Sequence, residues 1–309
     1  GLPVLPVAVH RPRETRLSYE RPFLLPASVL CFGSPIDTPQ LSASSLRGAL
    51  LEAFQETLSA RSFLNGSLGY ALLKGLKKHP RSRVFDGTDD SELSFDRILG
   101  AAIVLARVIR EATDKPRIGI ILPPGKGGLL ANLAAVMAGK TPVNLNFTAS
   151  HEAIKSAIRQ AGLDRFITAD PFVRKVPSFP WPPNRDLLFI ERVLPALRKK
   201  IILWTILSRL LPARLLAMIH DIATRGGEDE ALLLFTSGSS GEPKGVVLSH
   251  RNVLANVTQF ASRLDLPHGS AILGCLPLFH SFGCTVTLWF PVIEGVNLVT
   301  YPSPLETKR

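Results

Sequence analysis

The sequence predicts an α/β protein built from layered, mostly parallel sheets with flanking helices. Between residues 117 and 168, apolar runs of strand length alternate with stretches of helical periodicity, which is the pattern of βαβ units. A hydrophobic content of 46% with 20% charged residues indicates a packed globular chain, and 309 residues are enough for two modest domains. Both ends look cut: the strand pattern at residues 5–9 lacks partners, and that at 295–301 runs into Pro302 and Pro304.

Residues 1–64 form the first predicted domain, a small α/β unit. Strand patterns at residues 5–9 and 27–33 come first, and the second is followed by a turn at Ser34 and Pro35. Ser42 then opens a helix whose apolar residues recur on one face near the 3.6-residue period, at Leu46, Leu50, Phe54 and Leu58.

Residues 65–78 are predicted to be a linker, at Gly66 to Gly69, running into a helix at 68–77, and residues 79–309 form the second domain. A polar turn is expected at 86–92 and a proline-rich loop at 170–184. Between them, the predicted elements are a helix from Ser94 or Phe95, a strand at 117–122, a helix at 129–137, a strand at 141–145, a helix at 150–160 and a strand at 166–168.

The glycine-rich turn from Pro123 to Gly128 joins a predicted strand to a predicted helix. Such a turn is a suitable place for a phosphate site. The turn lacks the G-x-G-x-x-G spacing and an acidic residue at the expected distance after it. A second phosphate site and a plain βα turn both stay open, and the missing spacing favours the plain turn.

Residues 187–223 are apolar and basic at the same time. Arg198, Lys199 and Lys200 precede an aliphatic run that is too short and too charged for a comfortable membrane span. One interpretation is a cationic amphipathic helix on an anionic membrane surface, with Trp204 at the interface. The other is a helix packed on the protein's own core with a solvated basic edge.

The chemically most specific stretch is a bend between two apolar runs, 231–235 and 246–248. Its glycines allow close backbone approach, its free N–H groups and hydroxyls suit an anion, and its lysine adds a positive charge. The pattern favours a polyphosphate site over a flexible surface turn. A P-loop of the Walker type is excluded, because neither Ser nor Thr follows the lysine and a second strand comes next. The residues of the bend are Thr236, Ser237, Gly238, Ser239, Ser240, Gly241, Glu242, Pro243, Lys244 and Gly245.

Two further signals follow the bend. Ser249 is predicted to be the N-cap of a helix through Asn252 and Val257. Further on, His280 follows a strand-like run and precedes Gly283, so it could lie at the carboxyl end of a sheet, where ligands bind. The alternative is a histidine that is satisfied within the core.

The net charge and the number of cysteines indicate which kinds of partner and compartment to expect. A formal net charge of +11 and a pI near 10.0 favour acidic partners such as nucleotides, anionic lipid or an acidic carrier protein. The basic residues are dispersed and no zinc finger or stacking platform occurs, so no nucleic-acid partner is expected. Three cysteines without paired or metal-binding spacing, together with the lack of a signal peptide, favour the cytoplasm.

The bend from Thr236 to Gly245 closely resembles the phosphate loop of the acyl-adenylate-forming superfamily, whose signature is Thr-Ser-Gly-Ser/Thr-Ser/Thr-Gly-x-Pro-Lys-Gly. Pro277, His280 and Gly283 resemble a second segment of that superfamily, which lines the acyl-carboxylate and adenylate pocket. The resemblance implies that residues 79–309 are the first part of the large domain of such an enzyme. It also implies that the bend binds the phosphates of ATP with Mg²⁺, and that His280 is a catalytic residue in the substrate pocket.

The superfamily's reaction is implied by the same resemblance. A fatty carboxylate attacks the α-phosphate of ATP to give acyl-AMP and pyrophosphate, and the acyl group then passes to the thiol of coenzyme A or an acyl carrier protein. The superfamily's later motifs do not occur in this chain: a Tyr-Gly-x-Thr-Glu segment, a ribose-binding Asp, a hinge and a catalytic Lys. We therefore expect that the chain alone does not complete adenylation. The other function class left open is a non-catalytic, membrane-associated scaffold that retains the fold.

The first domain carries a second resemblance. Phe32 to Ile36 is similar to the C-terminal tail of lysophospholipid acyltransferases, and the order of the two domains resembles bifunctional 2-acylglycerophosphoethanolamine acyltransferase/acyl-acyl-carrier-protein synthetases. This resemblance implies a link to lysophospholipid reacylation and a peripheral place on the inner face of the cell membrane. His10, His79 and His151 are not followed by the aspartate of that family's H-x-x-x-x-D box, so any acyltransferase activity would reside outside this chain.

Overall fold

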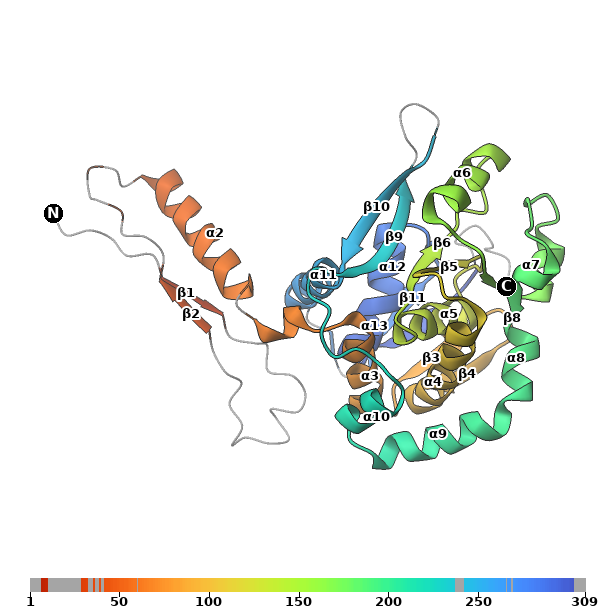
Figure 1. Ribbon diagram of the computed structural model, residues 1–309. Coiled ribbons are helices and arrows are strands. Elements are labelled where there is room, and N and C mark those ends of the chain that lie inside the picture. The colour runs from red at the N-terminus through yellow and green to blue at the C-terminus, as the bar shows by residue number, and fades with distance from the viewer. Residues whose placement is uncertain are drawn as a thin grey trace. The chain divides into compact units, whose positions relative to one another are not determined.

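The protein is described by a computed structural model with two compact units, residues 1–64 and 65–309 (Figure 1). In the first unit, two four-residue strands pair antiparallel, with Val7 opposite Phe32, and one long helix follows. These elements are β1 (Val7–His10), β2 (Val29–Phe32) and α2 (Ala43–Ser59). The residues that the structure describes are 7–10, 29–32, 36, 39, 42–59, 61–236, 242–264, 266–267 and 269–302.

The segment predicted to be a linker belongs to the second unit. Asn65 accepts a hydrogen bond from the Gly226 N–H, 3.1 Å, and Gly66 forms a β-bridge with Arg225. Helix α3 (Leu68–Lys78) then starts at its N-cap Ser67, and most of its residues are buried. These contacts were not predictable, because they join residues about 160 positions apart in the sequence. The predicted helix is confirmed, and the contacts of residues 65 and 66 attach its start to residues 225 and 226.

A four-stranded parallel sheet in the order β6-β5-β7-β8 confirms the predicted α/β architecture. Its central strand β5 pairs with β6 on one side and with β7 on the other. The strands are β5 (Arg117–Ile120), β6 (Thr141–Asn144), β7 (Phe166–Thr168) and β8 (Leu187–Phe189), and the helices between them are α5 (Lys126–Met137), α6 (His151–Ala161), α7 (Asp170–Lys175) and η3 (Asn184–Asp186).

A second four-stranded sheet has the order β11-β12-β3-β4, in which β4 is antiparallel and the other strands are parallel. A polar turn was predicted at 86–92. In the structure, this segment contains the end of β3, the hairpin turn and the start of β4. Its strands are β3 (Arg83–Asp86), β4 (Ser91–Ser94), β11 (Ala271–Gly274) and β12 (Asn297–Thr300). A third, two-stranded antiparallel sheet consists of β9 (Glu230–Thr236) and β10 (Lys244–Ser249).

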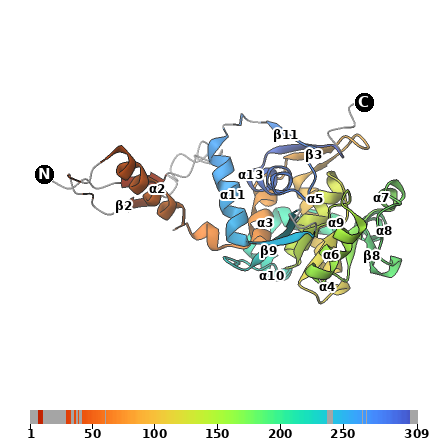
Figure 2. The same cartoon turned by 90° about the horizontal axis from the view of Figure 1, so that it is seen from above.

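Helices account for the remaining elements of the second unit. Helix α4 (Phe95–Ala112) is predominantly buried and lies against both α5 and α9. Figure 2 shows α11 beside α3 and α13, and the helix begins next to the start of β9. The other helices are η2 (Ser62–Asn65, at the unit boundary), α8 (Ile190–Ala196), α9 (Arg198–Leu210), α10 (Ala213–Ile219), α11 (His250–Arg263), α12 (Ser281–Cys284), the π-helix η4 (Thr285–Trp289) and α13 (Phe290–Glu294).

The hydrophobic core of the second unit has two parts. One part contains large, fully buried side chains such as Phe95 of α4 and Trp289 of η4. On the α6 side of the parallel sheet, a separate apolar cluster brings together Ile121, Val143, Leu145, Ile154, Phe166, Phe172, Phe179, Leu187, Phe189 and Leu233. Leu233 belongs to β9, so this second cluster connects the two-stranded sheet to the parallel one.

Candidate functional site

The hairpin of β9 and β10 holds both ends of the predicted phosphate bend. Thr236 lies opposite Lys244 in the antiparallel register, and the Thr236 hydroxyl lies 3.4 Å from the Lys244 carbonyl oxygen, to which it donates. The structure thus brings together the two ends of the bend, which are eight residues apart in sequence. Five residues that were predicted to bind phosphate lie outside the described part of the chain, so their roles stay predictions: Ser237, Gly238, Ser239, Ser240 and Gly241.

Strand β9 is fixed to the body of the unit by burial and by an ion pair. Its residues 231–234 are at most 5% exposed. At its start, the Glu230 carboxylate accepts two hydrogen bonds of 2.7 Å from the Arg117 guanidinium at the start of β5. The hydrogen bonds from Arg117 lower the pKa of Glu230, in spite of its partial burial. The bend therefore extends from a strand whose opposite end is tightly held.

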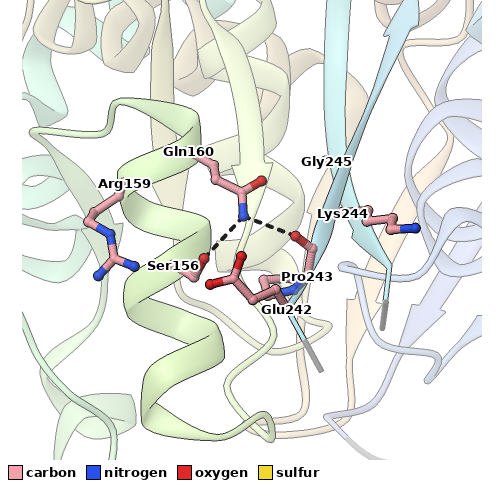
Figure 3. A pocket seen from close by; sticks show the side chains of 7 residues that line it. All are labelled: Ser156, Arg159, Gln160, Glu242, Pro243, Lys244 and Gly245. Atoms are coloured by element: carbon pink, nitrogen blue, oxygen red, sulfur yellow. Dashed lines mark hydrogen bonds between the residues drawn. The ribbon is translucent and has the colours of Figure 1, made fainter. Parts of the chain in front are cut away.

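An open pocket of about 570 Å³ lies where the bend meets helix α6 (Figure 3). The Gln160 amide donates to the Pro243 carbonyl oxygen, 3.0 Å, and to the Ser156 hydroxyl, 3.1 Å. Gln160 thereby fixes the position of the backbone just before Lys244. The lining residues come from α6 and from the end of the bend: Ser156, Arg159, Gln160, Glu242, Pro243, Lys244 and Gly245.

Lys244 itself is exposed, and its side chain points away from α6 and from Glu242 (Figure 3). Within the described part of the chain, no carboxylate forms an ion pair with its ammonium group. The next residue, Gly245, lies under two apolar side chains: an added Cβ would be 3.2 Å from Leu233 and 3.3 Å from Phe235. Lys244 therefore presents a positive charge at the end of the bend that no carboxylate among the described residues compensates.

The helix after the hairpin begins as the sequence predicts. The Ser249 hydroxyl accepts a hydrogen bond from the Asn252 N–H, and the Asn252 side chain accepts one from the Ser249 N–H, 3.0 Å, which completes a capping box. The Ser249 hydroxyl also donates to Glu228, 3.1 Å. Behind the cap, the half-buried His250 ring accepts a hydrogen bond from the Leu68 N–H, 3.0 Å, and partial burial lowers its pKa. These contacts hold the far end of β10 in place.

The second predicted segment, Pro277 to Gly283, forms a tight turn into α12. The His280 N–H donates to the Pro277 carbonyl oxygen, 3.1 Å, and the His280 carbonyl oxygen accepts from the Cys284 N–H, 2.8 Å. Gly283 lies so close to the backbone of Pro277 that an added Cβ would be 2.2 Å from the Pro277 carbonyl oxygen. The histidine is exposed, and its ring lies 5.5 Å from that of Phe279. The spacing Pro-x-x-His-x-x-Gly thus has a geometric basis: the glycine lets the turn close and display the histidine.

A buried polar group behind this turn was not found by sequence reasoning. Asn132 of α5 and Asn144 at the end of β6 exchange hydrogen bonds of 2.8 and 3.0 Å. The Cys284 thiol donates to the Leu278 carbonyl oxygen, 2.6 Å, and lies 3.9 Å from the Asn144 amide. Burial raises the pKa of Cys284 to about 12, so the thiol stays protonated and has a structural role. The available signal was Asn144, a polar residue that ends an apolar strand.

Helix α6 lies between the two predicted segments. Phe147, just before the helix, packs edge-on against Phe279, with 5.4 Å between the ring centroids. At the other end of α6, Gln160 binds Pro243. The histidine turn thus contacts the segment before α6 and the phosphate bend contacts the C-terminal end of α6. Among the described residues, no hydrogen bond or ring contact joins the two directly.

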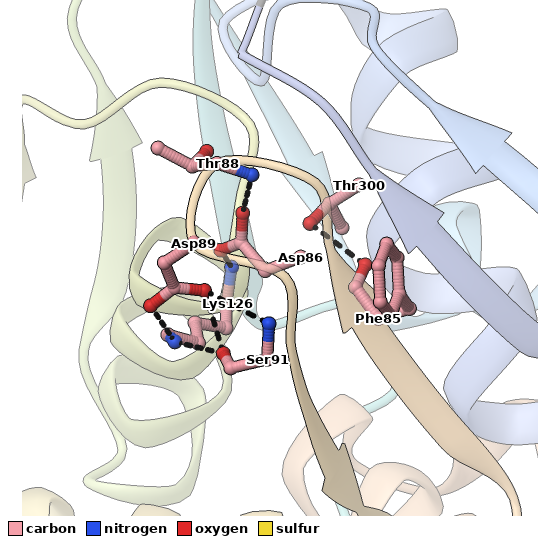
Figure 4. A network of polar contacts seen from close by, with 7 residues as sticks. All are labelled: Phe85, Asp86, Thr88, Asp89, Ser91, Lys126 and Thr300. Atoms are coloured by element: carbon pink, nitrogen blue, oxygen red, sulfur yellow. Dashed lines mark hydrogen bonds and ion pairs between the residues drawn. The ribbon is translucent and has the colours of Figure 1, made fainter. Parts of the chain in front are cut away.

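The glycine-rich turn at Pro123 to Gly128 is not available to a phosphate. The Asp86 carboxylate already accepts the Lys126 N–H at the start of α5, 2.9 Å, and also the Thr88 N–H, 2.9 Å (Figure 4). The Lys126 ammonium is bound to Asp89 and Ser91. The structure thus supports the plain βα turn, because the protein's own carboxylates occupy both the helix N-terminus and the lysine.

Gly128 in this turn is required by close packing. An added Cβ there would be 2.7 Å from Leu278 and 2.6 Å from the Pro123 oxygen, so only glycine lets the histidine turn pack against α5. Among the residues that the structure describes, no group of three His, Cys, Asp or Glu side chains is arranged to hold a metal ion.

Comparisons with known proteins identify relatives of the second unit. A family model described as AMP-binding enzyme matches residues 73–309. FadD13 of Mycobacterium tuberculosis, a long-chain-fatty-acid–CoA ligase, is 37% identical over 83 residues, which are 27% of this chain and 16% of that protein. FadD26 of Mycobacterium marinum, a long-chain-fatty-acid–AMP ligase, is 26% identical over 235 residues, 70% of this chain and 36% of that protein.

Among solved structures, the N-terminal domain of FACL13 from Mycobacterium tuberculosis has a TM-score of 0.60 at 21% identity. The match covers 77% of this chain and 57% of that one. It shows a shared fold. The chain spans no more than 36% of the length of the two curated relatives named above.

Proposed function

Because the chain belongs to the family of AMP-binding enzymes, we propose that it acts in fatty-acid activation. In the proposed reaction, a carboxylate oxygen of the fatty acid bonds to the α-phosphorus of ATP and the bond to pyrophosphate breaks. The acyl-AMP then reacts with a thiol, which takes the acyl group and releases AMP. The names of the relatives support this substrate class, since they are ligases of long-chain fatty acids.

The observation that carries the proposal is the uncompensated charge of Lys244 at the end of a bend with fixed ends. Two anions must meet in this reaction, so the largest barrier is electrostatic. The sequence of the bend supplies hydroxyls and N–H groups, its two ends are paired in the register of β9 and β10, and Gln160 binds the backbone just before Lys244. We propose that the bend binds the ATP phosphates with Thr236, Ser237, Gly238, Ser239, Ser240, Gly241, Lys244 and Gly245.

We further propose that the histidine turn contacts the fatty carboxylate. His280 is exposed on a turn that Gly283 and Pro277 hold rigidly, so its ring can donate a hydrogen bond or pack against the substrate without rearrangement. The aromatic rings of Phe147 and Phe279 provide an apolar neighbourhood next to it. Pro277, His280 and Gly283 together form this proposed pocket.

ATP would bring Mg²⁺ with its phosphates. This ion is commonly held by phosphate oxygens, one or two carboxylates and water, and does not need a complete protein cage. When bound, the ion would neutralise charge on the phosphates, and Lys244 would do the same from the protein side.

The thiol acceptor and the parent pathway are the finer parts of the proposal. Coenzyme A is supported by the names of the relatives, and an acyl carrier protein by the order of the two predicted domains. The link to lysophospholipid reacylation depends on Phe32 to Ile36, of which Gly33, Ser34 and Pro35 lie outside the described residues. We propose that the chain binds ATP but does not complete adenylation alone, since the superfamily's later motifs do not occur in it.

Titration of labelled ATP in the presence of Mg²⁺ tests the phosphate site. We expect Lys244→Ala to weaken ATP binding by about 10- to 100-fold, because a charge-assisted contact to phosphate contributes about 1.5–3 kcal/mol. Lys155→Ala removes an exposed lysine from α6 and should leave the affinity within about twofold, the scale of a minor surface change. If neither wild type nor variant binds ATP, or if both bind it equally, the chain is better described as a scaffold that has kept the fold.

A further inference from the structure

Helix α9 turns its small polar side chains inward. It packs against α4 at Gly100, where an added Cβ would be 2.3 Å from the Thr205 hydroxyl and 2.9 Å from the Ile201 carbonyl oxygen. The hydroxyls of Thr205 and Ser208 donate to carbonyl oxygens of their own helix, 2.8 and 2.9 Å. Ser208 is the buried residue of α9. A surface helix usually directs its large apolar side chains to the core. In α9, Ile201, Trp204 and Leu207 are only half-buried, and four other large aliphatic side chains are exposed.

Six large apolar side chains of α9 and α10 are exposed to solvent, whereas Leu216 of α10 is buried. Ile202, Leu203 and Ile206 are 51–52% exposed, and Leu210 is 75% exposed. They recur at helical spacing, so they form one stripe along the outer side of α9, which lies beyond α4 in Figure 1. Helix α10 adds two more exposed residues. The apolar face of α9 and α10 consists of Ile202, Leu203, Ile206, Leu210, Met218 and Ile219.

Positive charge surrounds this face. Arg198 and Lys199 lie one helical turn before Ile202 and Leu203, and Arg214 starts the outer side of α10. No acidic residue occurs between positions 192 and 220. In the described part of the chain, the cations Arg198, Lys199, Lys200 and Arg214 have no carboxylate partner, whereas Arg209 is held by Asp96 and Arg192 by Asp170.

We propose that the face formed by α9 and α10 binds the surface of an anionic lipid bilayer. A helix with an aliphatic stripe, basic neighbours and no acidic residue fits the boundary between acyl chains and anionic headgroups. Its 13 residues span about 20 Å, and the helix would lie flat. No helix among the described residues has the length and apolar character to cross a bilayer. The inference uses none of the ATP-site residues and stands apart from the proposed ligase reaction.

The structure corrects one detail of the sequence interpretation. Trp204 was expected at the membrane interface, but its ring packs edge-on against His220 of the C-terminal end of α10, with 4.0 Å between the ring centroids. Trp204 is only partly exposed and joins the two helices to each other. The membrane contact is therefore assigned to the aliphatic stripe and its basic rim.

Co-sedimentation of the full chain with lipid vesicles tests this face. We expect binding to vesicles of phosphatidylcholine with 30% phosphatidylglycerol, weakening as salt rises, and at least about tenfold weaker binding to pure phosphatidylcholine. Arg198→Gln/Lys199→Gln/Lys200→Gln should lower the partition coefficient about 100-fold, since each cation near an anionic surface contributes roughly fivefold. Leu203→Asn/Ile206→Asn should lower it at least about tenfold by removing two inserting side chains.

A matched control separates this face from overall charge. Arg81→Gln/Lys115→Gln/Lys155→Gln removes three exposed cations elsewhere and should change the partition coefficient less than about threefold, because these cations lie off the docking face. Circular dichroism and thermal unfolding establish that each variant is folded. Two results would overturn the proposal: wild-type protein that prefers anionic vesicles no more than neutral ones, or an on-face triple variant that loses no more binding than the control triple.

Discussion

The carbonyl oxygen of Pro277 and the Cα of Gly283 determine what the histidine turn can tolerate. A Cβ at position 283 would be 2.2 Å from this oxygen, 3.0 Å from the Pro277 carbonyl carbon and 3.3 Å from the Leu276 oxygen. All three atoms belong to the backbone, which cannot move aside as a flexible side chain could. The glycine is thus required by close approach of the chain, and His280 depends on it indirectly.

Gly283→Ala is expected to destabilise the second unit by about 1–3 kcal/mol, the usual cost of forcing extra atoms into a packed site. Chemical denaturation measures this change in the free energy of unfolding. Gly48→Ala is the contrasting variant, because a methyl group at position 48 of α2 would meet nothing within 4 Å. That substitution should leave stability unchanged or raise it by about 0.5–1 kcal/mol through helix propensity. Equal effects of the two alanines would refute the steric explanation.

His220 makes stability depend on pH. Burial, followed by the nearby charge of Arg110, lowers the pKa of its imidazole from 6.5 to about 4, and its buried Nε2 has no hydrogen-bond partner among the described atoms. The unfolded chain therefore binds a proton between pH 6.5 and 4 that the folded chain does not. The stability contributed by this group is complete above about pH 6.5 and is lost as the pH falls toward 4.

We expect the free energy of unfolding to decrease by about 1–2 kcal/mol between pH 7 and pH 4.5 on account of His220, allowing for solvent screening of a half-buried ring. In His220→Gln this part of the slope should disappear, and the smaller contribution of His250, whose pKa is also lowered by burial, should remain. Denaturation curves at several pH values measure the difference. An unchanged slope in the variant would show that His220 is not the source.

At the scale of elements, the boundaries that carry local signals were predictable. Ser249 is an N-cap as expected, and the helices predicted to start near Ser94 and at Ser150 begin directly after these residues, which are their N-caps. Gly162 ends α6 in the left-handed conformation, with φ of 63°. Local signals failed where pairing partners are distant. Strand β8 lay hidden in the apolar and basic stretch after residue 187, because its three residues become a strand only by pairing with β7. The short helix α7 was predicted to be loop since proline dominates that segment, although Pro171 lies at its permissive first turn.

Asp86 stabilises the start of helix α5 and the β3–β4 turn at the same time. Its carboxylate caps α5 through the Lys126 N–H and holds the β3–β4 turn through the Thr88 N–H. Asp86→Ala removes both contacts from a residue that is 5% exposed and should cost about 1–3 kcal/mol in unfolding free energy. Asp114→Ala, at an exposed aspartate, should cost less than about 0.5 kcal/mol. Thermal unfolding measures both, and a loss for Asp86→Ala as small as for Asp114→Ala would show that the cap is dispensable.

At the scale of the whole second unit, the candidate site depends on contacts that no local pattern contains. The motifs around Lys244 and His280 were recognisable from the sequence, because their residue types and spacing are specific. Their supports were not: Gln160 lies 83 residues before the carbonyl group it binds, and Asn144 lies 140 residues before Cys284. Such distant partners are chosen by the packing of sheets and helices, which a single sequence does not reveal.

The pair of Arg117 and Glu230 joins the phosphate hairpin to the parallel sheet across 113 residues. Both side chains are about three-quarters buried, with 24% and 28% of their surfaces exposed. A double-mutant cycle with Arg117→Gln and Glu230→Gln should give a coupling energy of about 1–3 kcal/mol, more than an exposed pair provides. Arg107 and Glu111, 74% and 65% exposed on α4, form the control pair, for which about 0.3–0.5 kcal/mol is expected.

The coupling should also follow pH in a defined direction. Hydrogen bonds from Arg117 lower the pKa of Glu230 below its ordinary value of 4.5, so the folded carboxylate stays ionised at pH values where the unfolded one is protonated. The contribution is complete above about pH 4.5 and disappears as the pH falls through the lowered pKa. If the coupling energy were the same at pH 7 and near pH 3, packing rather than charge would hold β9 to β5. The position of the bend would then not depend on this ion pair, and Glu230→Gln should leave ATP binding unchanged.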